Sequence, residues 1–104
     1  LTAAALRGKK IFEGKADCVK CHTPPYHGDK QKYALGLGSD SERDRTFATP
    51  ILVEVWRNAP YMYDGRAVTI KEVITTDNAN NRHGNTRGLT TQEADDLAEY
   101  VNSL

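Results

Sequence analysis

The feature that most limits how this chain can fold is the cluster Cys18-Val19-Lys20-Cys21-His22. These two cysteines are the only ones in the sequence, so a four-thiolate zinc site is excluded, and His22 is too close to serve as the distant histidine half of a zinc finger. A thioredoxin-like cysteine pair would need a βαβ surrounding, which the sequence does not show. A structural disulfide would leave the adjacent histidine without a role.

The spacing Cys-x-x-Cys-His is instead the pattern by which a haem is attached covalently to a chain. Two thiols add to the two vinyl groups on one porphyrin edge, and two intervening residues bring them within about one helical turn. We therefore expect Cys18, Cys21 and His22 to hold one covalent haem c, with His22 as the proximal ligand of its iron. Bacteria install this linkage outside the cytoplasm, so we expect a periplasmic or otherwise exported protein.

Length and charge narrow the remaining possibilities. The 104 residues suit a single domain over 1–104, and at 38% hydrophobic residues its own core would be modest without the apolar plate of a haem. Lys and Arg balance Asp and Glu at 14 each, which argues against a nucleic-acid or anionic-membrane partner. No apolar run approaches the roughly 20 residues of a membrane span. Residues 1–7 are too short for a signal peptide, so we expect a mature form or an excised domain.

The two ends of the chain carry the clearest helix signals. Thr2 precedes a helix predicted over residues 3–13, which has Gly8 on its apolar face and ends at Gly14. A capping box that begins at Thr90 opens a last helix. The apolar stripe of that helix consists of Leu97, Tyr100, Val101 and Leu104. The small Gly8 would let the two helices approach closely and cross, although periodicity alone is also consistent with two helices that only face a common core.

The middle of the chain is less regular. Residues 26–48 are polar and contain glycine, which predicts a long loop, and residues 77–88 predict a second one. Thr49-Pro50 is typical of a helix start, although alternating β-branched residues that follow it also favour a strand. We expect Ala59-Pro60 to end this element, and a capping box at Thr69 to open a short helix.

Two residue pairs on the end helices resemble the class I fold of the cytochrome c superfamily. In that fold a Gly-x-x-x-Phe face crosses a Leu-x-x-Tyr pair, and Gly8, Phe12, Leu97 and Tyr100 match this pattern. The resemblance implies an all-α domain in which short helices surround one covalent haem and the first and last helices cross.

A longer stretch resembles one branch of that superfamily. Residues 49–67, TPILVEVWRNAPYMYDGRA, are similar to the TP-x-L and APY-x-x-DGR segments of bacterial dihaem cytochrome c peroxidases, whose relatives mature methylamine dehydrogenase. The likeness covers about residues 1–23 and 46–104, as a C-terminal haem domain. This chain departs from the branch in having one haem motif and a short segment between His22 and Thr49, so we do not expect peroxidase activity from it alone.

Three residues are candidates for the distal ligand of the iron. His83 lies in the loop before the last helix, where the class I fold has its ligand, and we favour it. Met62 is the alternative, because methionine is a common distal partner in cytochromes c. His27 is only five residues from His22, and we expect it to be exposed to solvent. An open sixth position is the remaining option.

Several other residues are candidates for contacts with the haem. Arg66 and Arg57 suit pairing with its propionates, because a guanidinium matches a carboxylate. We expect the carbonyl of Pro24 or Pro25 to accept from Nδ1 of His22. The aromatic candidates for lining the haem are Trp56, Tyr61 and Tyr63.

These observations predict one-electron transfer by a c-type haem. The chain would act as a small carrier or as the electron-transfer domain of a larger exported oxidoreductase, with a redox partner protein or a fused catalytic domain. The alternatives are a peroxidase-like haem enzyme domain and a haem-based sensor, both of which require an open sixth site.

Overall fold

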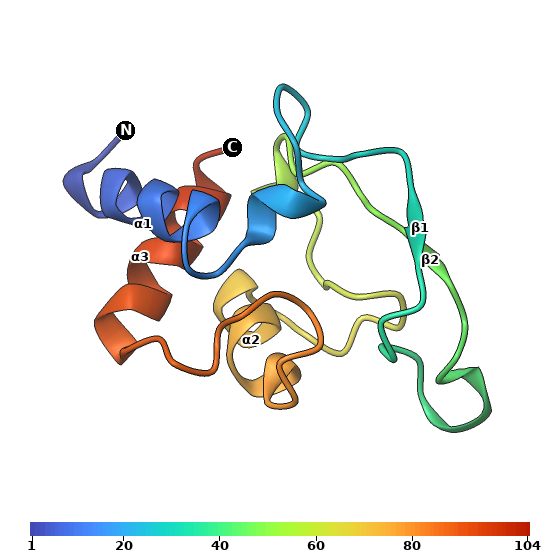
Figure 1. The fold of residues 1–104 in the computed structure, drawn as a ribbon. Coiled ribbons are helices and arrows are strands. Elements are labelled where there is room, and N and C mark those ends of the chain that lie inside the picture. The colour runs from blue at the N-terminus through green and yellow to red at the C-terminus, as the bar shows by residue number, and fades with distance from the viewer.

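The computed structural model describes all residues 1–104 and has helices at one end and a small β-ribbon at the other (Figure 1). The molecule measures 42 × 27 × 24 Å along its principal axes. The helices are α1 (Ala3–Glu13), α2 (Ile70–Ile74) and α3 (Thr91–Asn102), and the ribbon pairs β1 (Lys32–Tyr33) with β2 (Phe47–Ala48) in antiparallel register. Four 3-10 turns complete the elements: η1 (Cys18–Lys20), η2 (Asp40–Glu42), η3 (Val55–Arg57) and η4 (Thr76–Asn78).

The start and end signals of the two long helices are confirmed. The Thr2 hydroxyl accepts from the Ala5 amide at 3.0 Å, and Gly14 is the C-cap of α1. At α3 the Thr90 hydroxyl accepts from the Glu93 amide at 3.1 Å, while the Glu93 carboxylate accepts from the Thr90 amide at 3.0 Å. This reciprocal pair satisfies two amides that the first turn leaves unbonded.

The first and last helices pack directly against each other, with Gly8 at their closest approach. A Cβ built on Gly8 would lie 1.9 Å from the Asp96 carbonyl oxygen and 2.8 Å from Cβ of Tyr100, so only glycine fits there. Phe12 and Leu97 are fully buried between the two helices. The contact therefore forms a dry core at one end of the molecule.

The same interface contains one ion pair. Arg7 donates from Nε and Nη2 to the two carboxylate oxygens of Asp96, at 2.8 and 3.1 Å. The hydrogen bond and charge of this guanidinium lower the pKa of the Asp96 carboxyl. Asp96 is nearly inaccessible to solvent, and the two hydrogen bonds from Arg7 compensate for the hydration that its carboxylate loses.

The middle of the chain departs from the sequence prediction. The helix expected after Thr49-Pro50 is wrong, as is the competing strand, because only the short turn η3 forms there. The backbone turns into the left-handed region at Glu54 (φ 57°), which no regular helix or strand permits. The loop expected over residues 26–48 contains the β1–β2 ribbon, so the fold is helical with a small sheet rather than purely helical.

The short helix α2 begins as predicted, at Thr69. The Thr69 hydroxyl accepts from the Glu72 amide at 3.1 Å, but the Glu72 carboxylate accepts from Val68 rather than from Thr69, so the capping box is incomplete. The buried face of α2 consists of Ile70, Val73 and Ile74. None of the helices combines the length and apolar character needed to cross a bilayer.

Candidate functional site

A cavity of about 740 Å³ lies between the helical end of the molecule and the ribbon. Its size falls in the range of sites that enclose a drug-sized molecule. Most of its lining residues are apolar, and they come from segments between Phe12 in α1 and Val101 in α3. Cys18, Cys21 and His22 all line it. The motif that most constrained the sequence therefore opens onto the largest internal space.

The two cysteines are free thiols on a single turn. Cys18 begins η1, and the His22 amide donates to the Cys18 carbonyl at 2.9 Å, which closes one helical turn over the motif. Burial, reinforced by the charge of Asp17, raises the pKa of the Cys18 thiol to about 11. Both cysteines are half-buried at the wall of the cavity, where a planar ligand with two reactive edge groups would meet them.

His22 is held in one orientation by a backbone carbonyl. Its Nδ1 lies 2.8 Å from the carbonyl oxygen of His27. A carbonyl can only accept, so Nδ1 carries the proton and Nε2 keeps its lone pair for a metal. Burial lowers the pKa of the His22 imidazole, which favours the neutral form that a metal needs.

His27 departs from two sequence predictions, one about the acceptor for Nδ1 of His22 and one about its own exposure. The expected acceptor was Pro24 or Pro25, but the chain reaches His22 two residues later, where His27 adopts a left-handed backbone (φ 59°). His27 was also expected at the surface. Its ring is half-buried and packs edge-on against Phe12, with centroids 5.8 Å apart.

His83 faces His22 from the loop before α3. The two ring centroids lie 6.2 Å apart, with an angle of 55° between the planes. Two imidazoles that bind one metal from opposite sides should have centroids roughly 6.3 Å apart, because each metal–nitrogen bond measures about 2.0 Å. Burial, and to a smaller extent His22, lowers the pKa of His83 to about 4, so its imidazole is neutral at pH 7. The cavity and these two side chains fit an iron porphyrin.

Met62 and Tyr61 also line the cavity, on the loop that follows η3. The Tyr61 hydroxyl donates to the Val55 carbonyl at 3.0 Å, which fixes its ring against the wall. The loop is closed by a bridge between Tyr61 and Ala67, and Met62 has a left-handed backbone (φ 71°). The other predicted aromatic residue at the wall is Tyr63.

The structure does not bring Trp56, Arg57 or Arg66 to the cavity wall. Trp56 is 56% exposed. Arg57 pairs with Glu54, and the Arg66 guanidinium donates to the Asp64 carboxylate at 2.8 Å and to the Ser39 hydroxyl at 3.2 Å.

Among the polar residues at the wall that sequence reasoning missed are Arg82 and Tyr33. Arg82 immediately precedes His83 and donates to the Gly36 carbonyl at 3.2 Å. The Tyr33 hydroxyl donates to Asp29, a contact that raises the pKa of the Tyr33 phenol. The position of Arg82 beside a candidate ligand was the available signal, whereas Tyr33 lies in a stretch that reads only as loop.

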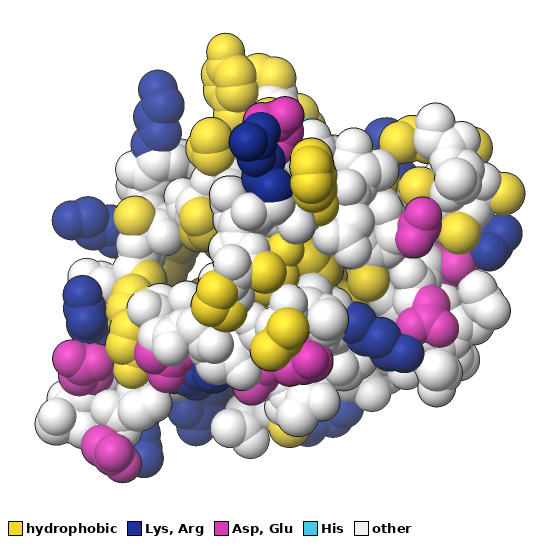
Figure 2. Space-filling view, turned by 180° about the vertical axis from the view of Figure 1, so that it is seen from behind, with side chains coloured by type: hydrophobic (Ala, Val, Ile, Leu, Met, Phe, Trp, Pro, Cys, Tyr) yellow, Lys and Arg dark blue, Asp and Glu magenta, His cyan; other side chains and the backbone are white.

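The outer surface carries charges of both signs. Figure 2 shows Lys and Arg side chains interspersed with Asp and Glu, with hydrophobic side chains between them. This distribution matches the balanced charge of the sequence and gives no continuous field of one sign on that face.

Solved structures with the same fold include a subunit of hydrazine synthase. The chain matches one chain of xenon-pressurised Kuenenia stuttgartiensis hydrazine synthase with a TM-score of 0.87 and 27% identity, over all of this chain and 47% of the other. A MauG-like protein associated with microbial copper homeostasis gives a TM-score of 0.70 at 23% identity, again over all of this chain and 47% of the other. The second likeness shows the fold alone.

Sequence relatives include a cytochrome-c peroxidase, a hydrazine synthase subunit and a methylamine utilization protein. Cytochrome-c peroxidase IdrP1 of Denitromonas iodatirespirans is 29% identical over 153 aligned positions, which cover all of this chain and 41% of the relative. Hydrazine synthase subunit gamma of Kuenenia stuttgartiensis is 28% identical over all of this chain and 42% of the relative. Methylamine utilization protein MauG of Methylorubrum extorquens is 32% identical over 69% of this chain and 24% of the relative.

The chain thus spans less than half the length of the curated relatives that it matches. The alignment with the peroxidase is also longer than this chain, so the relative carries insertions within the matched region. The sequence model for cytochrome c matches residues 5–104, which is nearly the whole chain. Together with the fold, this match identifies the chain as a member of the cytochrome c family, a domain that implies haem c and haem-based electron transfer.

Proposed function

We propose that this domain carries one haem c attached through Cys18 and Cys21, with His22 and His83 as the two axial ligands of its iron, and that it transfers single electrons. The observation that carries the proposal is the 6.2 Å separation of the two imidazole centroids across the cavity. That separation is close to the roughly 6.3 Å expected for two imidazoles that would hold one metal ion between them.

The residues around the cavity suit a carrier. A bound haem supplies an iron that alternates between its ferric and ferrous states. The His27 carbonyl holds Nδ1 of His22 and so fixes the direction of its Nε2 lone pair. Because His22 and His83 would both hold the iron, few groups would need to move when its charge changes. Two imidazoles also favour a lower potential than imidazole with thioether, because a methionine ligand raises the potential.

The wall residues divide into apolar and polar contacts with the porphyrin. Tyr61 and Met62 line the cavity and would pack against the porphyrin, and the mostly apolar wall would limit access of water to the iron. Arg82 is placed better than Arg66 to pair with a propionate, because Arg82 lines the cavity while Arg66 is bound to Asp64. Trp56 is too exposed for a contact in this arrangement, and we assign it no role at the haem.

The proposal also covers the extent of the domain, the crossing of its end helices, its compartment and its partner. Residues 1–104 form one haem domain in which α1 and α3 cross at Gly8, supported by the close approach at that glycine. Its place is the periplasm or another exported compartment, since thioether attachment takes place there. Its partner is a redox protein or a fused catalytic domain, which the greater length of the relatives supports.

Covalent attachment is tested by extraction. Acid–acetone treatment of the purified protein should leave the haem on the polypeptide, and a pyridine haemochrome spectrum should give one haem per chain. Cys18→Ser and Cys21→Ser should each leave one thioether, and the double variant should lose the haem on extraction. Haem that extracts from the wild type would refute the attachment.

The distal ligand is tested by a pair of variants. His83→Ala should give a high-spin ferric spectrum and a ferrous form that binds carbon monoxide. Met62→Leu, which keeps the apolar volume at the wall, should leave the spectrum nearly unchanged. The reverse pattern would assign the ligand to Met62, and a wild type that already binds carbon monoxide would indicate an open site.

A second candidate function, a peroxidase-like domain, is supported by the similarity to cytochrome-c peroxidase IdrP1. It requires an open or easily vacated sixth position, which the proximity of His83 to His22 disfavours. Hydrogen peroxide with a reduced donor should give no sustained turnover by the isolated domain. Sustained turnover would favour the enzyme over the carrier.

A further inference from the structure

We infer that Asn78 is a positioning residue that holds His83 at the iron, an inference that rests on the proposed ligation by His83. Asn78 lies at the end of η4 and is only 3% exposed. Its Oδ1 accepts from the His83 amide at 2.8 Å, and its Nδ2 donates to the His83 carbonyl at 2.7 Å. One carboxamide therefore forms hydrogen bonds with both the amide and the carbonyl of His83.

The carboxamide is tied to the rest of the loop as well. Nδ2 of Asn78 also lies within bonding distance of the Thr86 hydroxyl at 2.7 Å and the Gly84 carbonyl at 3.2 Å. Only an amide side chain supplies an acceptor and paired donors from one short group. A carboxylate or an apolar side chain of similar size cannot reproduce these contacts.

The two imidazoles differ in what holds them. The His22 ring is fixed directly, because its Nδ1 bonds to the His27 carbonyl. The buried Nδ1 of His83 has no hydrogen-bond partner, so nothing comparable fixes that ring. The direction of the His83 side chain therefore depends on its backbone, and Asn78 is the side chain that fixes that backbone. A ligand loop with no regular secondary structure needs such an anchor.

Asn81, which also borders the large cavity, provides a comparison in the same loop. Its Oδ1 accepts from the Thr86 and Arg87 amides, at 2.8 and 3.1 Å, and it makes no hydrogen bond to His83. Asn81→Ala thus loosens the loop by removing a carboxamide of the same kind, but leaves both bonds between Asn78 and His83. If Asn78→Ala and Asn81→Ala differ in carbon monoxide binding, the difference reports the hydrogen bonds between Asn78 and His83 rather than the general stability of the loop.

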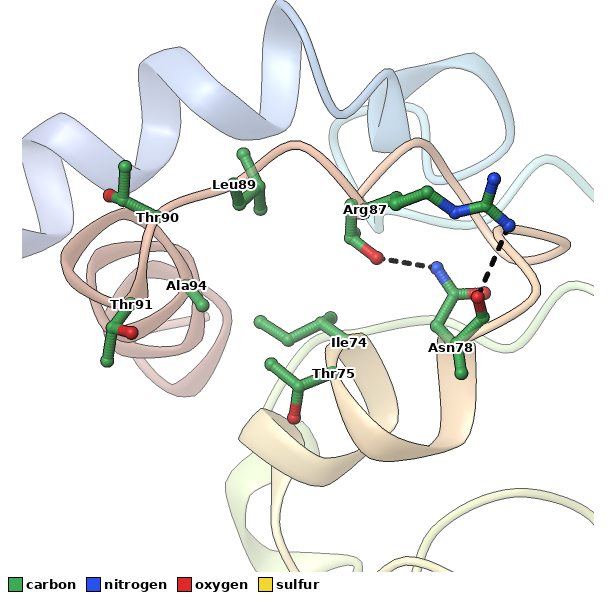
Figure 3. A pocket seen from close by; sticks show the side chains of 10 residues that line it. Ile74, Thr75, Asn78, Arg87, Leu89, Thr90, Thr91 and Ala94 are labelled. Carbon is green, nitrogen blue, oxygen red and sulfur yellow. Dashed lines mark hydrogen bonds between the residues drawn. The ribbon is translucent and has the colours of Figure 1, made fainter.

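Truncation at Asn78 should be tolerated by the fold. Asn78 and Thr86 border a second cavity of about 300 Å³, which is also lined by Thr75, Arg87 and Thr90 (Figure 3). Water can enter a polar space of this size and bond to the groups that Asn78→Ala leaves unpaired. Asn78→Asp supplies a second variant of nearly unchanged shape, in which the donors to the His83 and Gly84 carbonyls are replaced by a repelling carboxylate oxygen.

The experiment compares carbon monoxide binding by the reduced haem protein in the wild type, Asn78→Ala, Asn78→Asp and Asn81→Ala. Loss of a group that orients a metal ligand weakens metal binding about 10- to 100-fold. We therefore expect both Asn78 variants to take up carbon monoxide at least about tenfold faster than the wild type, with high-spin features in the ferric spectrum. Asn81→Ala should stay within about twofold of the wild type, and added imidazole should restore the low-spin spectrum of the Asn78 variants.

Three outcomes decide the matter. If His83→Ala changes carbon monoxide binding but neither Asn78 variant does, the inference about Asn78 is overturned while the ligand assignment stands. If Asn81→Ala has the same effect as Asn78→Ala at equal denaturation midpoints, Asn78 acts only through loop stability, and the inference is likewise overturned. If His83→Ala leaves the low-spin spectrum intact, the ligand assignment itself fails, and the role of Asn78 fails with it.

Discussion

Replacing Gly8 with alanine tests how closely the end helices must approach. In an exposed helix this change stabilises, because alanine is favoured over glycine by about 1 kcal/mol. At Gly8 the added Cβ would meet the Asp96 carbonyl oxygen at 1.9 Å, whereas real Cβ atoms essentially never approach another atom within 3.0 Å. That oxygen belongs to the backbone and cannot rotate away, so the helices would have to separate.

The magnitude follows from these opposing effects. Overpacking of a tight interface costs about 1–3 kcal/mol, and a backbone obstruction belongs at the upper end of that range. Subtracting the gain in helix propensity of about 1 kcal/mol leaves a net loss of about 2 kcal/mol in the free energy of unfolding. For a domain of this size that loss lowers the melting temperature by roughly 10 °C.

The assay is thermal and urea denaturation of the haem-loaded protein, followed at 222 nm and in the Soret band. Gly88→Ala is the matched control, because no atom lies within 4 Å of its added Cβ, and we expect its stability to stay within about 0.5 kcal/mol of the wild type or to rise slightly. If Gly8→Ala is as stable as Gly88→Ala, the close approach of α1 and α3 is not a constraint and the reasoning is refuted.

Three further predictions concern the helical end of the molecule. Arg7→Gln removes the group that lowers the pKa of Asp96. The wild type should therefore be more stable than this variant above about pH 4, and the difference should vanish as the pH falls through the lowered pKa, as urea midpoints between pH 2 and 7 would show. Thr90→Ala should lower the free energy of unfolding by about 1 kcal/mol by removing the N-cap of α3; an unchanged urea midpoint would contradict the role of this cap. Leu97→Ala, at a fully buried position, should cost about 2–5 kcal/mol yet leave the visible spectrum unchanged.

The helical end could be predicted from the sequence because its signals are local. Thr2, Gly14 and Thr90 each act within one helical turn: the Thr2 and Thr90 hydroxyls make the capping hydrogen bonds that their spacing indicates, and Gly14 is the C-cap of α1. The region after Thr49-Pro50 could not be predicted in the same way. There the backbone conformation at Glu54 depends on how the chain wraps around the cavity, and that cavity does not appear in any local pattern.

In the candidate site, too, the residues with local sequence signals could be predicted and the others could not. Cys18, Cys21 and His22 could be proposed from spacing alone, because covalent haem attachment requires them to be adjacent on one turn, and all three line the cavity. His83 is favoured by its place before the last helix, and the structure places its ring centroid 6.2 Å from that of His22. Asn78 was hidden, because an asparagine in an asparagine-rich segment is typical of any loop and only its four contacts distinguish it.

The molecule combines a closely packed interface between α1 and α3 with a cavity in its middle, and this combination affects which parts of the chain unfold locally. Phe12 and Leu97 are buried by protein alone, so α1 and α3 can keep their amides protected whether or not the cavity is filled. The β1–β2 ribbon and the His83 loop both line the cavity, so their protection depends in part on what occupies it. Hydrogen exchange of the cofactor-free chain should therefore be slow in the two end helices and fast elsewhere. Filling the cavity should bring the two regions toward a single opening free energy.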